Sequence, residues 1–507
     1  MDTDVNYSLI DPLSFKQLFL DDYSFQTITG LKKVIKRPSK QGYIIKPDRS
    51  KGQTLVQSNN KPIWNPDINK WELWYLAFYN APFQGPGNIN WGDYHYATSN
   101  DGVEWEYPNL GLYEWENSYH NNLAYHSKLD FLKRRAQKNP VNISERRLQH
   151  LIRDDNDKDI NKLYKGLFSN SDTFNRYPAF SSNGFEWFFP NIEGIYSEDT
   201  SSLMFDSFKS QFVATVKKRT EWGRSVCIST SKDFIKWSIP KLILHTDEID
   251  MVNRQERINF VLKNKEYLSP PKIDINTDYI AQLYLMPIMN YENLYIGFPL
   301  IFNPAGPDLP QMNHCGLNQT ELAVSRNLYD WERVANRDIF IGIDPWDGIS
   351  YDTTQVSICG SPIIKNNEIW IYYQGARFRG SSEIYHNKYK EYFNDFGALG
   401  LAKLRLDGFV SLFAENYGQL ITKPFKVSEN ILKINANSLK GNIKVSIVDA
   451  QTLDPLPNFS LDECDILVRD NIDIKVSWNG NSKIKYNKPI RVIFNLKCSE
   501  IYSFWIE

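Results

Sequence analysis

The sequence lacks the features that mark several large protein classes. Its 507 residues include five cysteines, scattered and never in a CxxC pair, so neither a disulfide framework nor a cysteine zinc site is predicted. No stretch approaches 18 apolar residues, and the first residues lack a basic segment followed by an apolar run. We therefore expect a cytoplasmic protein that does not associate with membranes, and the sequence leaves its oligomeric state open.

The sequence also lacks an excess of either charge. Lys and Arg number 58 against 60 Asp and Glu, a net charge of −2, which argues against nucleic acid as a partner. It has no phosphate-binding glycine loop, serine-hydrolase elbow or kinase signature, so we expect no cofactor. The histidines His95, His120, His314 and His386 share no metal-ligand spacing, so we expect no metal site.

A short phrase that ends in tryptophan recurs four times. Each copy follows a short β-type run, places Asp, Asn or Gly in a turn, and closes on a Trp that begins the next strand. The successive tryptophans are 82, 50 and 94 residues apart, so a bare unit of about 50 residues carries insertions in some copies. The four copies are residues 99–105, 182–187, 231–237 and 325–331.

A second recurring element, an aromatic and β-branched strand that follows a loop, occurs five times. Its copies are residues 66–75, 157–168, 205–215, 290–297 and 365–373. Repeated strands and turns with a period near 50 residues are typical of a β-propeller. Five copies predict five blades, and residues 399–409 end the fifth with a degenerate phrase that lacks its Trp.

The character of the chain changes near residue 415, where alternating apolar and polar runs replace the Trp phrase. Alternation of this kind predicts an antiparallel β-sandwich. The predicted fold is therefore all-β: an N-terminal extension (1–19), a five-bladed β-propeller (20–414) with insertions at about 112–150 and 244–278, and a C-terminal β-sandwich (415–507). The first insertion holds the basic stretch 133–147, either a solvated helical excursion or a docking surface for an acidic partner.

These features resemble the glycosyl hydrolase family 32 N-terminal-domain-like bacterial proteins, within the propeller superfamily of glycoside hydrolase families 32, 43 and 68. The stretches that carry the resemblance run almost from end to end of the chain: 18–22, 96–102, 108–112, 368–373 and 459–465. The resemblance implies a carbohydrate substrate and axial carboxylates that act on either side of a glycosidic bond. It specifies architecture better than activity, because one scaffold hosts many chemistries.

The expected acids are not all present. Where the resemblance places the blade-one nucleophile, seven positions before a Trp64-Asn65-Pro66 turn, the chain has Ser58. Asp48 is the nearest acid upstream, and it is a candidate for substrate binding. Asp199 stands seven positions before Asp206, the spacing that the resemblance assigns to an axial carboxylate, so it is the first catalytic candidate.

The second catalytic candidate is Asp347, in a Trp-Asp-Gly segment of the fifth blade. Trp346 would stack on a pyranose ring, and Asp347 would form the acid pair with Asp199. Asp352 follows closely, either as a substrate ligand or as an outward turn residue.

The remaining candidates are substrate-binding residues. Gln282 and Tyr284 replace an acid in the fourth blade, where they could bind hydroxyl groups. Arg224 begins a strand of the third blade, where it would make a structural ion pair, hold Asp199 ionised or bind an anionic sugar group.

Together these features predict a glycoside hydrolase that acts on a bacterial glycan or glycoconjugate. Two alternatives stay open: a carbohydrate-binding propeller without catalysis, and a phosphorylase or transglycosidase in which one acid suffices. A phosphorylase should surround its axial acid with several Arg, Lys or His side chains.

Overall fold

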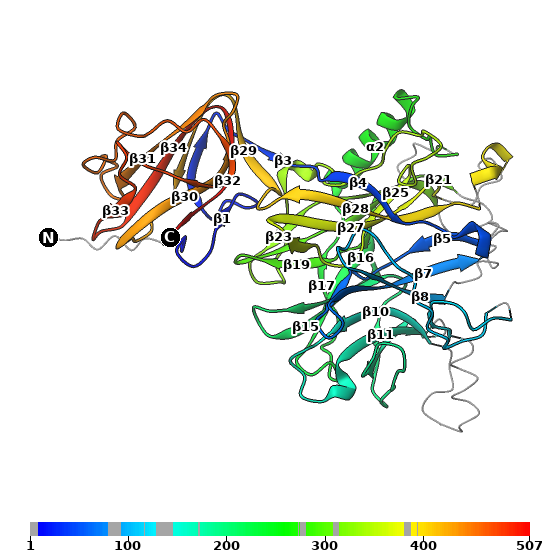
Figure 1. Cartoon of the computed structure of the whole chain (residues 1–507). Helices are drawn as coiled ribbons and strands as arrows, with labels where there is room; N and C mark the ends of the chain where they lie inside the picture. The colour runs from blue at the N-terminus through cyan, green and yellow to red at the C-terminus, as the bar shows by residue number, and fades with distance from the viewer. Residues whose placement is uncertain are drawn as a thin grey trace.

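The computed structural model describes residues 9–79, 93–115, 117–127, 146–170, 173–271, 273, 280–307, 314–379, 387–392 and 394–507. β-strands dominate, and α2 (Glu248–Lys263) is the long helix of this part of the chain. The short 3-10 turns are η1 (Arg49–Lys51), η2 (Ile160–Lys162), η3 (Ala335–Arg337) and η4 (Lys390–Tyr392). Figure 1 shows a larger body of strands joined to a smaller one that contains the C-terminus. The predicted all-β class is therefore confirmed, with α2 as its helical exception.

The strands between residues 39 and 405 pair into five successive antiparallel groups, here named strand groups I to V. Group I contains β5 (Gln53–Gln57), β6 (Ile63–Asn65), β7 (Lys70–Tyr79), β8 (Asp93–Ser99) and β9 (Leu123–Tyr125). Group II contains β10 (Arg147–Arg153), β11 (Tyr164–Asn170), β12 (Asn175–Ser181) and β13 (Ile195–Tyr196). Group III contains β14 (Ser201–Asp206), β15 (Gln211–Thr220), β16 (Gly223–Ser231) and β17 (Lys241–Leu244).

Group IV is divided into an inner and an outer ladder. The inner ladder contains β18 (Gln282–Leu285), β21 (Leu300–Pro307) and β22 (His314–Thr320). The outer ladder contains β19 (Ile288–Tyr291), β20 (Leu294–Gly297), β23 (Ala323–Ser325) and β24 (Glu332–Arg333). Pro287 and Pro299 stand at the division, where neither can donate the N–H that a continuous ladder needs.

Group V is completed by a strand from the start of the chain. It contains β25 (Gln355–Ile358), β26 (Ile363–Lys365), β27 (Glu368–Ala376) and β28 (Gly397–Arg405), followed by β4 (Ser39–Ile45). Tyr43 and Lys40 of β4 both bind the buried carboxylate of Asp352, each at 2.6 Å. This pairing joins sequence-distant segments into one sheet.

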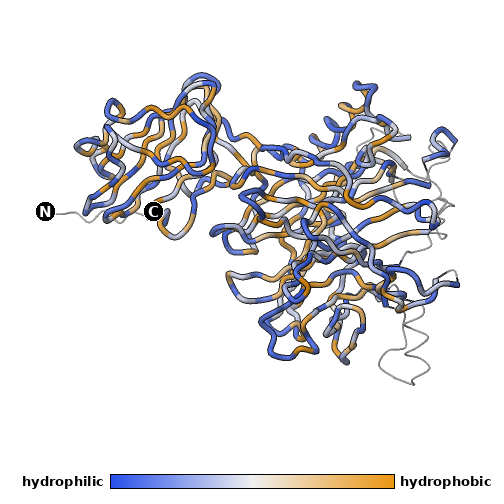
Figure 2. The backbone as a smooth tube through the Cα atoms, in the orientation of Figure 1, coloured by the Kyte–Doolittle hydropathy of each residue, from blue (hydrophilic) through white to orange (hydrophobic). Residues whose placement is uncertain are grey.

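Apolar cores lie between consecutive groups. Separate buried clusters join groups I and II, II and III, III and IV, and IV and V. A fifth cluster joins group V to group I, where Trp370 and Leu399 meet Leu73 and Val56. Figure 2 shows hydrophobic and hydrophilic residues alternating along the strands, as expected for sheets that bury their faces.

The recurring Trp phrase forms the same turn in each of its four copies. The Ser hydroxyl accepts from backbone N–H groups, and the Asp or Asn side chain that follows accepts from the residues two and three positions on. The residue after that Asp or Asn is left-handed in every copy, namely Gly102, Gly184, Phe234 and Leu328. Phe234 and Leu328 are completely buried, so their apolar burial offsets the cost of about 1–2 kcal/mol for this conformation.

The smaller body, here the C-terminal β-domain, folds around its own apolar core. Its sheet contains β1 (Gln17–Leu18), β2 (Phe25–Thr29), β3 (Lys32–Ile35), β29 (Val410–Thr422), β30 (Glu429–Asn437), β31 (Asn442–Asp449), β32 (Asp470–Lys475), β33 (Lys483–Lys485) and β34 (Ile490–Ile506). The propeller was predicted to begin at residue 20, but residues 17–35 pair with β29 and β34 instead. Short strands at the chain start carry no Trp phrase, so the sequence pattern could not assign them to a sheet.

The two insertions differ in what the structure describes. In the second, 244–278, α2 begins with a capping box between Asp247 and Asp250 and packs its buried residues against β21 and β22. In the first, 112–150, β9 and the start of β10 are described. The basic residues 133–135, and His386, lie outside the described residues.

Asp407 connects the two bodies. It lies in the degenerate fifth phrase, where the chain leaves β28 and enters β29, and its side chain is completely buried. Its carboxylate accepts from Lys16 Nζ (3.1 Å), Asn435 Nδ2 (3.1 Å), Ser503 Oγ (2.7 Å) and the hydroxyl of Tyr291. These donors come from four separate segments, so one carboxylate holds the larger body on the β-domain.

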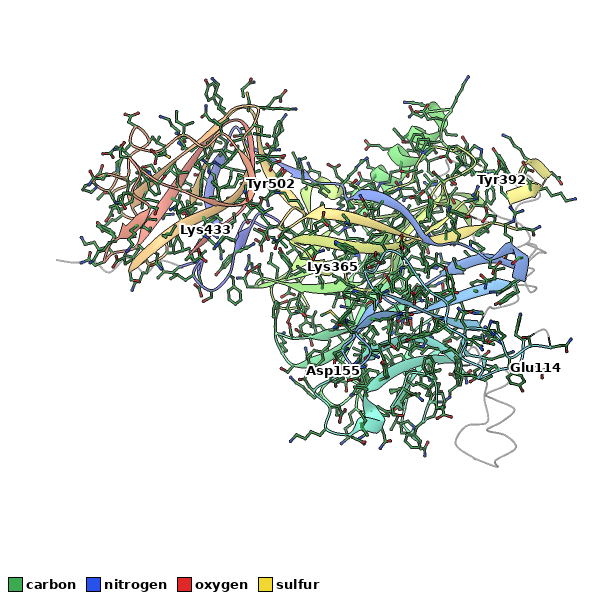
Figure 3. All side chains as sticks on the ribbon, viewed as in Figure 1. Glu114, Asp155, Lys365, Tyr392, Lys433 and Tyr502 are labelled. Carbon is green, nitrogen blue, oxygen red and sulfur yellow. The ribbon has the colours of Figure 1, made fainter. Side chains whose placement is uncertain are left out.

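A second set of contacts crosses the same junction. The Arg405 guanidinium lies 4.8 Å from the ring of Tyr502, which Figure 3 labels where the bodies meet, and donates to Asn435 at 2.6 Å. Lys36 pairs with Glu500 at 2.7 Å. The junction is therefore polar and specific.

We expect Asp407→Ala to lower the free energy of unfolding by about 3–5 kcal/mol, because it leaves buried donors unpaired. Urea denaturation followed by tryptophan fluorescence measures this change. The control is Asp454→Ala, an exposed position of the β-domain, which should change stability by about 0.5 kcal/mol or less. Equal effects of the two substitutions would contradict the role given to Asp407.

Candidate functional site

The first strand of each group begins at the edge where the second strand ends. The pairs that mark this edge are Gln53 with Tyr79, Arg147 with Ser169, Ser201 with Val216, Gln282 with Phe302, and Gln355 with Ala376. Single parallel bridges, Asn318 to Gln355 and Gly397 to Leu55, join neighbouring groups close to the same edge. Side chains of different groups can therefore converge there.

Asp199 lies at this edge, two residues before β14. Its carboxylate accepts from Lys217 Nζ of β15 at 2.5 Å. The Asp199 side chain is 44% exposed, whereas that of Lys217 is 3% exposed. A buried ammonium thus holds a carboxylate that solvent can reach.

The electrostatic surroundings keep Asp199 ionised. Burial opposes ionisation, but the ammonium of Lys217, a hydrogen bond from Tyr284 and the charge of Arg176 together outweigh it. The pKa of Asp199 falls from its ordinary 3.8 to about 2. At neutral pH this group is therefore a base or nucleophile and not a proton donor.

The ring of Tyr284 lies among three cations. Lys217 Nζ is 3.7 Å from the ring centre, and the guanidinium carbons of Arg379 and Arg224 are 5.1 and 5.5 Å from it. The same two guanidinium carbons lie 4.6 and 6.0 Å from the ring of Phe302. Aromatic faces attract cations, so the two rings position Arg379 and Arg224 close together.

Amide side chains continue this arrangement. Gln282 Oε1 accepts from Arg224 at 2.9 Å. Gln355 Oε1 accepts from Asn318 Nδ2 at 3.1 Å and lies 3.5 Å from Arg379 Nη1. We call the set Asp199, Lys217, Arg176, Arg224, Arg379, Gln282, Tyr284, Phe302, Asn318 and Gln355 the Asp199 cluster; it draws on strand groups II, III, IV and V.

Positive charge dominates the Asp199 cluster, in which four cations surround one carboxylate. Arg176 is buried, and burial lowers its pKa to about 10, although the charges of Asp199 and Tyr94 favour its protonated form. Burial likewise lowers the pKa of Arg224, as does the neighbouring charge of Arg379. The cluster therefore combines one negative group with an excess of positive charge.

The structure brings four of the predicted site residues together: Asp199, Arg224, Gln282 and Tyr284. Their contacts place Arg224 and Lys217 on the same ring, so the Tyr284 ring is flanked by cations instead of offering an open platform for sugar. The catalytic or binding roles of the four remain predictions.

Asp347 does not join them in any contact of the described residues. Its carboxylate accepts from the N–H groups of Ile349 (2.8 Å) and Ser350 (2.6 Å) and from the hydroxyl of Ser350 (2.9 Å). Burial acts to raise the pKa of Asp347, but these hydrogen bonds outweigh it, so the pKa is lowered. An Asp-Gly pair favours such a turn, so the residue expected in an acid pair caps its own loop.

The other predicted residues have structural partners. The Trp346 ring packs 4.9 Å from those of Tyr389 and Tyr392 in a small apolar cluster. Asp352 belongs to the ion pair with Lys40 described above. Asp48 caps η1, where its carboxylate accepts from Ser50 Oγ at 2.6 Å.

Lys217, Arg176 and Arg379 were not among the residues predicted for the site. Each basic residue stands in or just beyond a strand, where it is indistinguishable from a solvated lysine or arginine. The available signal was the antiparallel pairing of β14 with β15: Ser201 opposes Val216, so the residues just before β14 lie close to those just after Val216, and Lys217 is one of them.

The described residues contain no group of three or more His, Cys, Asp or Glu side chains placed to hold a metal ion. No helix in this part of the chain has the length and apolar character needed to span a membrane.

No protein-family model and no curated protein sequence matches this chain. Solved structures of similar shape include an N-acetylgalactosamine deacetylase from F. plautii in complex with blood group B trisaccharide, 12% identical over 75% of this chain and 97% of that chain, with a TM-score of 0.39. Another comes from the GH130 family, described as mannoside phosphorylases with members that are glycoside hydrolases targeting β-1,2 mannosidic linkages in Candida mannan (11% identity, 76% and 96% coverage, TM-score 0.42). A third is the catalytic domain of the Coprinopsis cinerea GH62 α-L-arabinofuranosidase (13% identity, 73% and 97% coverage, TM-score 0.41). Such distant likeness assigns neither a family nor an activity to this chain.

We expect Lys217→Met to raise the pKa of Asp199 above its value of about 2, because burial persists while the ammonium is lost. Carbon-13 NMR of labelled aspartate carboxyl groups measures the titration, and Asp199→Asn identifies the resonance. Lys218→Met, on the exposed neighbouring residue, is the matched control and should leave the value near 2. A midpoint that stays near 2 in Lys217→Met would refute this electrostatic description.

Proposed function

We propose that strand groups I to V are the blades of a five-bladed β-propeller and that the C-terminal β-domain is its β-sandwich. Two observations support the ring. Apolar clusters join every consecutive pair of groups, including V with I, and β4 completes group V by pairing with β28. Strands that pack in such a closed cycle are characteristic of propellers.

We further propose that the protein is a glycoside hydrolase acting on a glycan at the Asp199 cluster. The observation that carries this proposal is the solvent-accessible, ionised carboxylate of Asp199 at the convergence of four strand groups. Glycosidic cleavage passes through a transition state with positive charge near the anomeric carbon. An ionised carboxylate stabilises that charge, and it can also attack the carbon or activate the attacking water.

The leaving-group oxygen requires a proton from a different group. Asp199 is ionised in the unliganded protein, and its neighbour Glu198 accepts from the backbone N–H of Arg219 at 2.7 Å. The described contacts of Asp199 include no second carboxylate. The substrate or a co-substrate therefore has to alter the protonation of this cluster or bring the proton itself.

Amide groups beside Asp199 suit a hydroxylated ligand. Gln282 and Gln355 lie in the first strands of groups IV and V, and both side chains are half-buried. Amides donate and accept, so they can bind sugar hydroxyl groups of either polarity. Their positions on rigid strands would fix the orientation of the sugar.

We expect Asp199→Asn to lower glycan turnover by about 10²–10⁴-fold, because the amide carries no charge for the transition state. Reducing-end release from a panel of bacterial oligosaccharides measures turnover. The control is Asp347→Asn, since an asparagine keeps the turn capped and Asp347 makes no contact with the cluster in the described residues.

Circular dichroism and thermal melting of both variants confirm that they are folded. Equal turnover by wild type and Asp199→Asn would remove Asp199 from catalysis. Glycan binding without any turnover by the wild-type protein would favour the carbohydrate-binding alternative.

A further inference from the structure

Seven of the described arginines form ion pairs with carboxylates. Ion pairs join Arg153 to Asp67 and Asp155, Arg257 to Glu321, Arg326 to Asp21, Arg333 to Asp250, Arg337 to Asp247, Arg377 to Asp395 and Arg405 to Asp470. Each pair balances a charge that would be costly to leave alone in a desolvated position.

Arg379 departs from the pattern. Among the described residues its nearest polar partner is the neutral amide oxygen Gln355 Oε1, at 3.5 Å from Nη1. Its Nε and Nη2 atoms are buried and make no hydrogen bond. Such a guanidinium, with two unsatisfied atoms and no carboxylate partner among the described residues, is prepared for an acceptor that these residues do not supply.

Arg224 adds a second positive charge beside Arg379. Arg224 and Arg379 lie over the same two rings, Tyr284 and Phe302, and the charge of Arg379 lowers the pKa of Arg224. Within the described residues, the carboxylate of the Asp199 cluster is already bound by Lys217 at 2.5 Å. Like charges held together by a rigid scaffold repel until an anion lies between them.

The proposed reaction also favours an anion bound at this cluster. Developing positive charge at an anomeric carbon would be opposed by four cations around one carboxylate. An anion bound beside Asp199 would neutralise that excess.

We propose that Arg379 and Arg224 bind an oxyanion group beside Asp199, so that the ligand is either free inorganic phosphate or a glycan carrying an acidic substituent. The shared chemistry is a group with at least two acceptor oxygens, which planar guanidinium groups bind in a bidentate manner. This inference rests on the proposed function in taking the Asp199 cluster as the substrate site, but it does not require turnover.

The test measures binding by isothermal titration calorimetry at constant ionic strength. The probes are inorganic phosphate, trigalacturonate as an acidic glycan, and a neutral trisaccharide, with sodium chloride as the salt blank. We expect wild type to bind phosphate or trigalacturonate. Arg379→Gln should weaken that binding about tenfold or more, because it removes charge-assisted hydrogen bonds.

Two further variants keep the result interpretable. Arg379→Lys retains the charge but not the planar fork, so we expect weakening smaller than that in Arg379→Gln and a preserved fold. Arg37→Gln removes an equally positive but exposed arginine from the segment between β3 and β4, and it should bind as wild type does.

The phosphate and trigalacturonate titrations distinguish free phosphate from an acidic glycan as the ligand. Phosphate binding lost in Arg379→Gln assigns free phosphate, whereas trigalacturonate binding without phosphate binding assigns an acidic glycan. The inference is overturned when neither probe binds wild type, or when Arg379→Gln and Arg37→Gln bind alike. Because binding is measured without turnover, anion binding by a protein that cleaves no glycan would refute the hydrolase proposal and leave this inference intact.

Discussion

The pairing of β4 with β28 is the contact on which the larger body depends. Without it, group V would present an unpaired strand edge, and group I would pack against an incomplete sheet. Asp352 reinforces the pairing, since Lys40 and Tyr43 of β4 both contact its buried carboxylate. Asp352, which the sequence suggested for substrate contact, thus has partners that hold β4 in place.

The Asp199 cluster follows from that arrangement. Its members are separated by up to about two hundred residues of sequence, from Arg176 to Arg379, yet they lie near the same edge of strand groups II to V. Backbone pairing within each group and the apolar clusters between groups fix the strands, and the strands hold these side chains in place. The aromatic rings of Tyr284 and Phe302 hold the guanidinium groups at close quarters, so the electrostatic character of the site is set by packing as much as by charge.

Much of the architecture could be predicted because it repeats. The Trp phrase has one local conformation in four places, and local hydrogen bonds of its Ser and Asp or Asn side chains determine that conformation. Asp199 and Arg224 were found because their spacing from recognisable turns is short. Asp347 caps its own turn in the structure, and its catalytic role stays a prediction, because an Asp-Gly pair suits a turn as readily as it suits a sugar site and spacing alone does not separate the two.

Three of the four cations, Lys217, Arg176 and Arg379, were missed for a different reason. A lysine at the end of a strand is commonly solvated, and what makes Lys217 and Arg379 unusual is their neighbours from other strand groups. That information resides in the tertiary structure and not in any local pattern. The same holds for the boundary near residue 20, which short strands without the Trp phrase could not reveal.

The placement of residues 17–45 also bears on the order in which the molecule can be completed. β1, β2 and β3 pair with β29 and β34, and β4 pairs with β28, so the earliest strands of the chain find their partners among the last. During synthesis these early strands remain unpaired while several hundred further residues are added, and long-range pairing of this kind is intrinsically slow. Groups I to IV can assemble in sequence as they emerge, but the larger body is completed only by β28 and the β-domain only by β34. Each body therefore depends on strands made several hundred residues after its first one.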